Sequence, residues 1–95
     1  MTRYRLSRRA EQDLEDIWIY LAQSDELTAD LMLGKILDKL PMLAKFPNMG
    51  KLRSGLMEGL RSFPIKPYIV FYILSQNHIE IVRIFHHSRD IKSEF

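Results

Sequence analysis

The hydrophobic and polar positions of this chain change their period once, from a helical spacing in the first half to strand-like runs in the second. In the first half, apolar residues recur at intervals of four, three and four: Ala10, Leu14, Ile17 and Leu21. This spacing puts them on one stripe of a helix, with the acidic residues between them facing water: Glu11, Asp13, Glu15 and Asp16. Ser7 is a good N-cap, because its hydroxyl can accept hydrogen bonds from first-turn amides. The pattern predicts a helix from about Arg8 to Gln23, after a short strand that contains Tyr4 and Leu6.

A second helical stripe follows the polar break Ser24-Asp25-Glu26. Its apolar residues are Ala29, Leu33, Ile36 and Leu40. Pro41 has no amide hydrogen to donate to the carbonyl of Leu37, so we expect a kink or a fresh turn there. The segment Pro47-Asn48-Met49-Gly50 then ends the helical structure. Two antiparallel helices with a short connection form a hairpin whose apolar stripes need a cover.

Strand patterns in the second half of the chain supply that cover. β-branched and aromatic side chains run from Tyr68 to Leu74 and again from Ile79 to Phe85, and Gln76-Asn77 between them fits a hairpin turn. A shorter strand around Leu60 to Phe63 comes before them, limited by the two prolines that follow it. The order of elements predicts an α+β fold, β-α-α-β-β-β, with an N-terminal helix hairpin packed on a small antiparallel sheet.

Length and composition narrow the class of protein. The chain has 95 residues, of which 46% are hydrophobic, and this is enough for a single domain over residues 1–95 with a modest core. It contains no cysteine, which excludes disulfides and cysteine-ligated zinc and fits a reducing cytoplasm. No apolar run reaches the roughly 20 residues of a membrane span. We therefore expect a cytoplasmic protein that makes no contact with a membrane.

The charge is distributed unevenly along the chain. Residues 1–44 hold six Lys or Arg against eight Asp or Glu, which gives −2, whereas residues 45–95 hold eight against four, which gives +4. The second half is therefore the candidate surface for an acidic partner, with a solvated basic face as the alternative.

Arg83 is the most unusual residue of the last predicted strand, because it interrupts an apolar run. Alternation puts it on one face with Ile79, Ile81, Phe85 and His87. An unpaired guanidinium there would be costly, so we expect Arg83 to reach a ligand, a carbonyl, solvent or a carboxylate such as Asp90 or Glu58. If the strand around Arg61 joins the same sheet, Arg61, Arg83 and the two histidines lie together as a site for a phosphate or an acidic partner.

His86 and His87 are adjacent on that strand and are expected to face opposite sides. They cannot chelate one metal ion as a simple pair, so we expect no metal site. Either one can act as a general acid or base near neutral pH, although no carboxylate at a fixed spacing orients them. The glycine-containing segment 50–55 lacks the Gly-Lys-Ser/Thr of a P-loop, and we expect no cofactor.

Five groups of residues keep an order and spacing that is specific only when they are taken together. They are Leu6-Ser7 with Ala10, Asp13-Leu14, Ile17 and Tyr20; Phe46-Pro47-Asn48-Met49-Gly50 with Arg53; Gly59-Leu60-Arg61-Ser62-Phe63-Pro64; Tyr68-Ile69-Val70-Phe71-Tyr72; and Ile81-Val82-Arg83-Ile84-Phe85-His86-His87-Ser88-Arg89-Asp90. In this order they resemble the ParE branch of the RelE/ParE toxin superfamily over nearly the whole chain. Pro41 and the doubled histidine depart from the pattern, since ParE-like chains more often have one histidine followed by a small residue.

The resemblance implies the toxin of a bacterial type II toxin–antitoxin system. ParE-like members poison DNA gyrase by binding, with no chemistry of their own, and a ParD-like antitoxin neutralises them. Operator DNA is then contacted only indirectly, through the antitoxin. On this interpretation there is no catalytic residue, and the residues that contact the target are Arg53, Arg61, Arg83 and Arg89.

RelE-like members of the same superfamily imply a different activity, ribosome-dependent cleavage of mRNA by attack of a 2′-hydroxyl on the adjacent phosphate. That reaction needs cations to stabilise the phosphorane and groups to transfer protons. Arg53, Arg61 and Arg83 would supply the charge and His86 or His87 the proton, with the ribosome and mRNA as partners. The lysine-rich catalytic equipment typical of RelE-like members is not evident, so we favour the gyrase interpretation.

Overall fold

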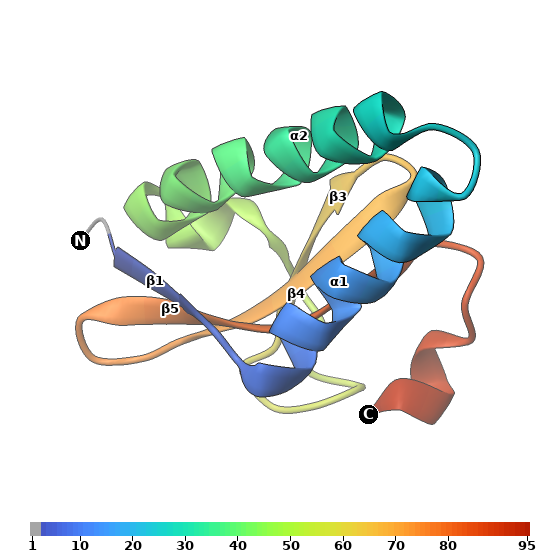
Figure 1. The fold of residues 1–95 in the computed structure, drawn as a ribbon. Helices are drawn as coiled ribbons and strands as arrows, with labels where there is room; N and C mark the ends of the chain where they lie inside the picture. The colour runs from blue at the N-terminus through green and yellow to red at the C-terminus, as the bar shows by residue number, and fades with distance from the viewer. Residues whose placement is uncertain (1–2) are drawn as a thin grey trace.

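The computed structural model describes residues 3–95, and its two helices lie over one face of a five-stranded sheet (Figure 1). The strands follow the order β1-β5-β4-β3-β2 across the sheet. The elements are β1 (Arg3–Leu6), α1 (Arg8–Ala22), α2 (Glu26–Lys45), the 3-10 turn η1 (Pro47–Met49), β2 (Lys51–Leu52), β3 (Arg61–Ile65), β4 (Tyr68–Leu74), β5 (His78–His86) and η2 (Ile91–Glu94). The predicted α+β class and the order of its helices and main strands are confirmed. Over the described residues, neither helix is both long and apolar enough to cross a membrane.

Side-chain caps define where both helices begin. The Oγ of Ser7 accepts a hydrogen bond from the amide of Ala10 at 3.0 Å, as predicted, and Asp25 accepts one from the amide of Thr28 at 3.2 Å. We expected a kink or a fresh turn at Pro41; the helix α2 continues through Pro41 to Lys45, so the fresh turn does not form. Pro41 and Leu37 both lie on the exposed side of the helix, where water can bind the carbonyl that lacks its amide partner.

The sheet contains the predicted hairpin and two pairings that the sequence pattern did not predict. The amide of Ser75 donates to the carbonyl of His78 at 2.8 Å and closes the connection between β4 and β5. The short strand β2 pairs with β3 at one edge of the sheet. At the other edge, β1 pairs with β5 in the parallel direction, so the sheet is mixed.

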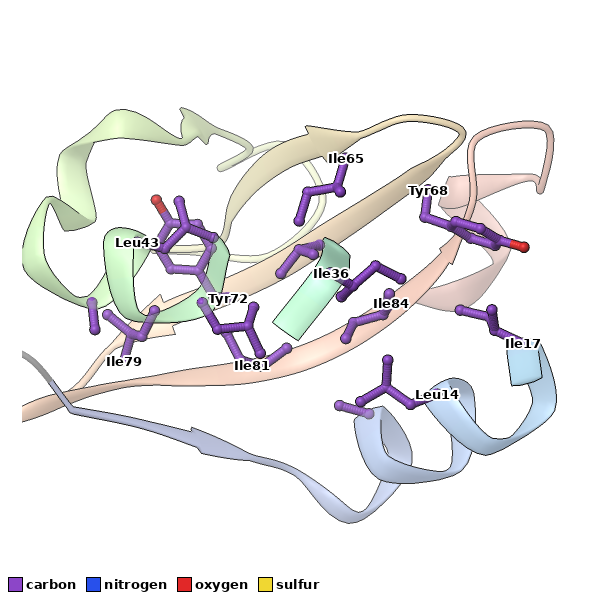
Figure 2. Packing of buried hydrophobic residues seen from close by; sticks show 14 residues of the cluster. Leu14, Ile17, Ile36, Leu43, Ile65, Tyr68, Tyr72, Ile79, Ile81 and Ile84 are labelled. Atoms are coloured by element: carbon purple, nitrogen blue, oxygen red, sulfur yellow. The ribbon is translucent and has the colours of Figure 1, made fainter. Parts of the chain in front are cut away.

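Two apolar clusters lie on opposite faces of this sheet. The larger one fills the space under the helices and includes Ile36, Tyr72 and Ile84 (Figure 2). The smaller one consists of Leu60, Phe71 and Phe85, with the C-terminal residues Ile91 and Phe95 packed against it. The ring centroid of Phe95 lies 5.0 Å from that of Phe71, so the C-terminal segment covers the face that the helices leave open.

A bulge in β5 changes the face of every side chain after it. Tyr72 is opposite Ile81 and Phe71 is opposite Arg83, so Val82 is an extra residue on β5. As a result, Ile84 joins Ile79 and Ile81 under the helices, whereas Phe85 joins the smaller cluster. The expectation that Arg83 and Phe85 share a face with Ile79 and Ile81 is therefore wrong, because simple alternation fails at a bulge.

Candidate functional site

Arg83 forms a buried ionic network with two carboxylates. Its Nε and Nη2 donate to the two carboxylate oxygens of Asp13 at 2.8 and 3.1 Å, and its Nη1 donates to Oε1 of Glu94 at 2.7 Å. Arg83 is only 6% exposed. The hydrogen bonds that Arg83 donates to Asp13 and Glu94 raise the pKa of Arg83, and the one to Glu94 lowers the pKa of that carboxyl group. The prediction of a carboxylate partner is confirmed, but the partners are Asp13 and Glu94 rather than Asp90 or Glu58.

Sequence reasoning missed both acids of this network, and it placed Asp13 on the wrong side of its helix. Asp13 was expected to face water, yet it is buried, and it also accepts a hydrogen bond from the amide of Ile84 at 2.9 Å. Because β1 pairs with β5 only as far as Ile81, Asp13 satisfies an edge amide that no strand covers. A signal was present: Asp13 follows Ala10 by three residues and precedes Ile17 by four, which puts it on the apolar stripe itself.

Arg61 lies in a different environment, beside η1. Its Nη1 donates to the carbonyl oxygen of Gly50 at 2.8 Å and is 3.5 Å from that of Asn48. The hydroxyl of Tyr72 donates to the carbonyl of Pro47 at 2.7 Å and accepts from the amide of Gly50 at 2.9 Å, which holds the same turn in place. Burial raises the pKa of Tyr72. The guanidinium of Arg61 is partly exposed, and among residues 3–95 its Nε and Nη2 have no hydrogen-bond partner.

The strand register separates Arg61 from Arg83. Arg61 is opposite Tyr72, which packs under the helices, whereas Arg83 is opposite Phe71, which packs in the smaller cluster. The two arginines therefore start from opposite faces of the sheet. Arg53 occupies a third position, where its Nε donates to the Oγ of Ser62 at 2.9 Å. The expectation that Arg61, Arg83 and the histidines lie together is wrong, because the bulge and the register place them apart.

The two histidines do stack on each other at the end of β5. Their ring centroids are 4.6 Å apart, since His87 follows the last residue of the strand and does not continue the alternation. The Nδ1 of His86 accepts from the amide of Ser88 at 3.1 Å and lies 2.8 Å from its Oγ. The ring of His86 also contacts Tyr68 edge-on, with centroids 5.6 Å apart. Within residues 3–95, no three His, Asp or Glu side chains are placed to hold a metal ion.

A groove of about 530 Å³ lies between α1 and the open end of the β4–β5 hairpin, where β4 begins and β5 ends. Ile17 and Tyr68 are among its apolar lining residues, and Tyr20 lines it from the exposed side of α1. Asp16 gives one rim a negative charge, and Arg89 gives another a positive charge. The groove can therefore bind an apolar side chain with polar groups around it.

Comparisons with known proteins give matches that extend over nearly the full length of this chain. A family model described as ParE toxin of type II toxin–antitoxin system, parDE, matches residues 4–91. Toxin ParE1 of Caulobacter vibrioides is 36% identical over 95 residues, which cover 98% of this chain and 97% of that protein. Toxin RelE2 of the same organism is 32% identical over 81 residues, which cover 85% of this chain and 90% of that protein. A solved structure described as a chromosomal ParDE TA system from P. aeruginosa has the same fold, with a TM-score of 0.76 at 22% identity over 90% of this chain and 96% of that one.

Proposed function

Because this chain belongs to the ParE toxin family of type II toxin–antitoxin systems, we propose that it inhibits DNA gyrase by binding, with no chemistry of its own. Membership of the family confirms the resemblance found in the sequence. The proposal places the toxin in the bacterial cytoplasm together with gyrase. The residues offered for contact are the arginines that keep exposed surface, Arg53, Arg61 and Arg89, whereas the role of Arg83 is to hold the fold.

The dispersal of the basic groups is the observation that carries this proposal. A ribonuclease of the RelE type needs a free cation at the phosphorane and a proton-transfer group beside it. Here two carboxylates neutralise Arg83, and Arg61 starts from the opposite face of the sheet. His86 and His87 contact each other, Tyr68 and Ser88 rather than either arginine. This arrangement supports a protein that acts by shape and charge.

Purified components test the proposal directly. We expect the purified toxin to block supercoiling, or to stabilise cleaved DNA, in a reaction that contains only gyrase, plasmid and ATP. A translation reaction reconstituted from purified parts is the control, and its mRNA should stay intact. Site-specific mRNA cuts together with normal supercoiling would replace the proposal with the ribosome-dependent nuclease.

We further propose that a ParD-like antitoxin neutralises the toxin by docking an apolar segment in the groove between α1 and the β4–β5 hairpin. The groove has an apolar lining and charged rims, which suits a segment that is disordered when free and folds on binding. The relative of known structure is itself described as a ParDE system. Any contact with operator DNA would then come through the antitoxin.

A pair of neighbouring residues on α1 tests the antitoxin site. Tyr20 lines the groove, and Ile19 beside it is also exposed but does not line it. We expect Tyr20→Ala to weaken antitoxin binding by roughly tenfold or more, as truncation of an aromatic anchor commonly does. Ile19→Ala is the matched control and should bind as the wild type does. Equal affinities of all three proteins in calorimetry would exclude this groove as the binding site. If the wild type does not bind, the antitoxin is excluded as a partner.

A further inference from the structure

Three exposed apolar residues lie on the segment after α2 that Arg61 contacts. Phe46, Met49 and Leu52 are 55%, 43% and 51% exposed. They lie on one short stretch of chain, and Arg61 joins it because its Nη1 contacts the carbonyls of Asn48 and Gly50 and its strand position is opposite Leu52. Aromatic residues, Met and Arg are enriched at protein–protein interfaces, so exposed residues of this composition on one segment mark a candidate binding surface. We call these four residues, Phe46, Met49, Leu52 and Arg61, the Arg61 surface.

The guanidinium of Arg61 is held in an orientation that suits a carboxylate. Backbone carbonyls hold Nη1, and these carbonyls are themselves fixed by a turn that the buried hydroxyl of Tyr72 locks. The opposite edge of the guanidinium, Nε and Nη2, has no partner among residues 3–95. Nε and Nη2 together form the edge that donates two parallel hydrogen bonds to a carboxylate. Because the group is already positioned, little side-chain entropy remains to be lost on binding.

The local charge selects an acidic partner. Residues 45–61 contain Lys45, Lys51, Arg53 and Arg61 against the single acid Glu58, a net charge of +3. Three exposed apolar side chains beside one arginine fit a protein surface better than a phosphate backbone, which is held mainly by many Lys and Arg contacts. The groove beside α1 is lined by none of these residues, so the Arg61 surface is a separate site.

We propose that the Arg61 surface binds an acidic segment of the target protein. A carboxylate of that segment binds Nε and Nη2 of Arg61, and an apolar side chain next to it packs on Phe46, Met49 and Leu52. This inference rests on the proposed function, because it names the surface with which the toxin holds gyrase.

Two substitutions with matched controls test the surface in the supercoiling reaction. Arg61→Gln removes the charged guanidinium, and Arg5→Gln makes the same charge change on β1, at the opposite edge of the sheet. Phe46→Ser removes an exposed apolar side chain, and Leu27→Ser does so at the other end of α2. We expect Arg61→Gln and Phe46→Ser each to need roughly tenfold or more toxin for half-inhibition, which is the effect of losing a charge-assisted pair or an anchor. The controls should match the wild type, and all four should keep its melting temperature.

The possible outcomes separate this inference from the proposed function. If the wild type inhibits gyrase and Phe46→Ser and Arg61→Gln inhibit equally well, the surface is wrong and the function stands. If the wild type does not inhibit gyrase, both fail together. If the wild type binds plasmid DNA alone and Arg61→Gln loses that binding, the partner is nucleic acid and the inference is overturned. Arg61→Lys is expected to recover only part of the inhibition, because a lysine keeps the charge but not the two parallel hydrogen-bond donors.

Discussion

Arg83 and Arg61 lie two strands apart in the same sheet, and they differ in what surrounds them. Arg83 donates through three nitrogens to Asp13 and Glu94 and is almost completely buried. Among residues 3–95, Arg61 donates only through Nη1, to backbone carbonyls, and it keeps exposed surface. An arginine in an apolar strand is therefore available to a partner only where no buried carboxylate reaches it. The Asp13–Arg83–Glu94 network holds the fold, whereas the Arg61 surface is free for binding.

The largest effect is expected from breaking the network at Asp13. Asp13→Ala leaves the guanidinium of Arg83 buried without its main partner and the amide of Ile84 without an acceptor. Loss of one partner of a buried pair typically costs about 3–5 kcal/mol, and we expect that decrease in the free energy of unfolding from urea titrations. Glu15→Ala, an exposed acid on the same helix, is the control and should stay within about 0.5 kcal/mol of the wild type. Similar values for both variants would mean that the network does not stabilise the fold.

A substitution at Gly50 tests the support beneath Arg61. A Cβ there would overlap the hydroxyl of the buried Tyr72 and lie 2.8 Å from its ring carbon Cε1, so Gly50→Ala must shift either the turn or the ring. Overpacking of this kind costs about 1–3 kcal/mol. We also expect weaker gyrase inhibition, because the carbonyl of Gly50 positions Arg61.

The control for that substitution is Gly55→Ala, where a Cβ meets no atom within 4 Å in the part of the chain that the structure describes. Thermal melting and the supercoiling assay together decide the outcome. A Gly50→Ala protein with wild-type stability and wild-type inhibition would show that the turn is not a fixed support.

A smaller effect is expected from Glu94, and it depends on pH. The hydrogen bond from Arg83 lowers the pKa of Glu94 below its ordinary value of 4.5. The stability that this ion pair contributes is therefore fully present above the ordinary value and is lost as the pH falls through the lowered one. Glu94→Gln should flatten the decrease in the free energy of unfolding below about pH 5. The measurement is the free energy of unfolding from denaturation curves at a series of pH values. If it falls equally steeply with decreasing pH for both proteins, the ion pair is contradicted.

The smallest effects are expected from the histidines. If the toxin acts by binding through the arginines, His86→Ala and His87→Ala should reduce growth inhibition on induction by less than about threefold, since neither histidine belongs to the Arg61 surface and loss of an exposed side chain outside it changes little. Loss of a general acid or base would instead reduce the rate by roughly 10²–10⁴. A histidine variant that melts like the wild type yet has lost all toxicity would favour catalysis over binding.

The secondary structure could be predicted because its causes are local. The Ser7 cap and the stripe from Ala10 to Leu21 determine α1, and the apolar runs determine the β4–β5 hairpin. The parallel pairing of β1 with β5 could not be predicted, because it joins residues more than 70 positions apart in the sequence. The bulge at Val82 was missed for a related reason, since one extra residue in a ladder leaves no local mark in an apolar run.

The sequence alone indicated that Arg83 needs a polar partner, with a carboxylate as one of the alternatives, since a guanidinium inside an apolar strand cannot be buried unpaired. It also determined that the second half of the chain is basic, and its motifs indicated the family. The packing of the chain settled that the carboxylate partners of Arg83 are Glu94 and Asp13, the latter 70 residues away, and that two donors of Arg61 have no partner among residues 3–95. The physical reason is that burial creates the need for a partner at one position, but which groups meet there depends on how helices and strands pack in three dimensions.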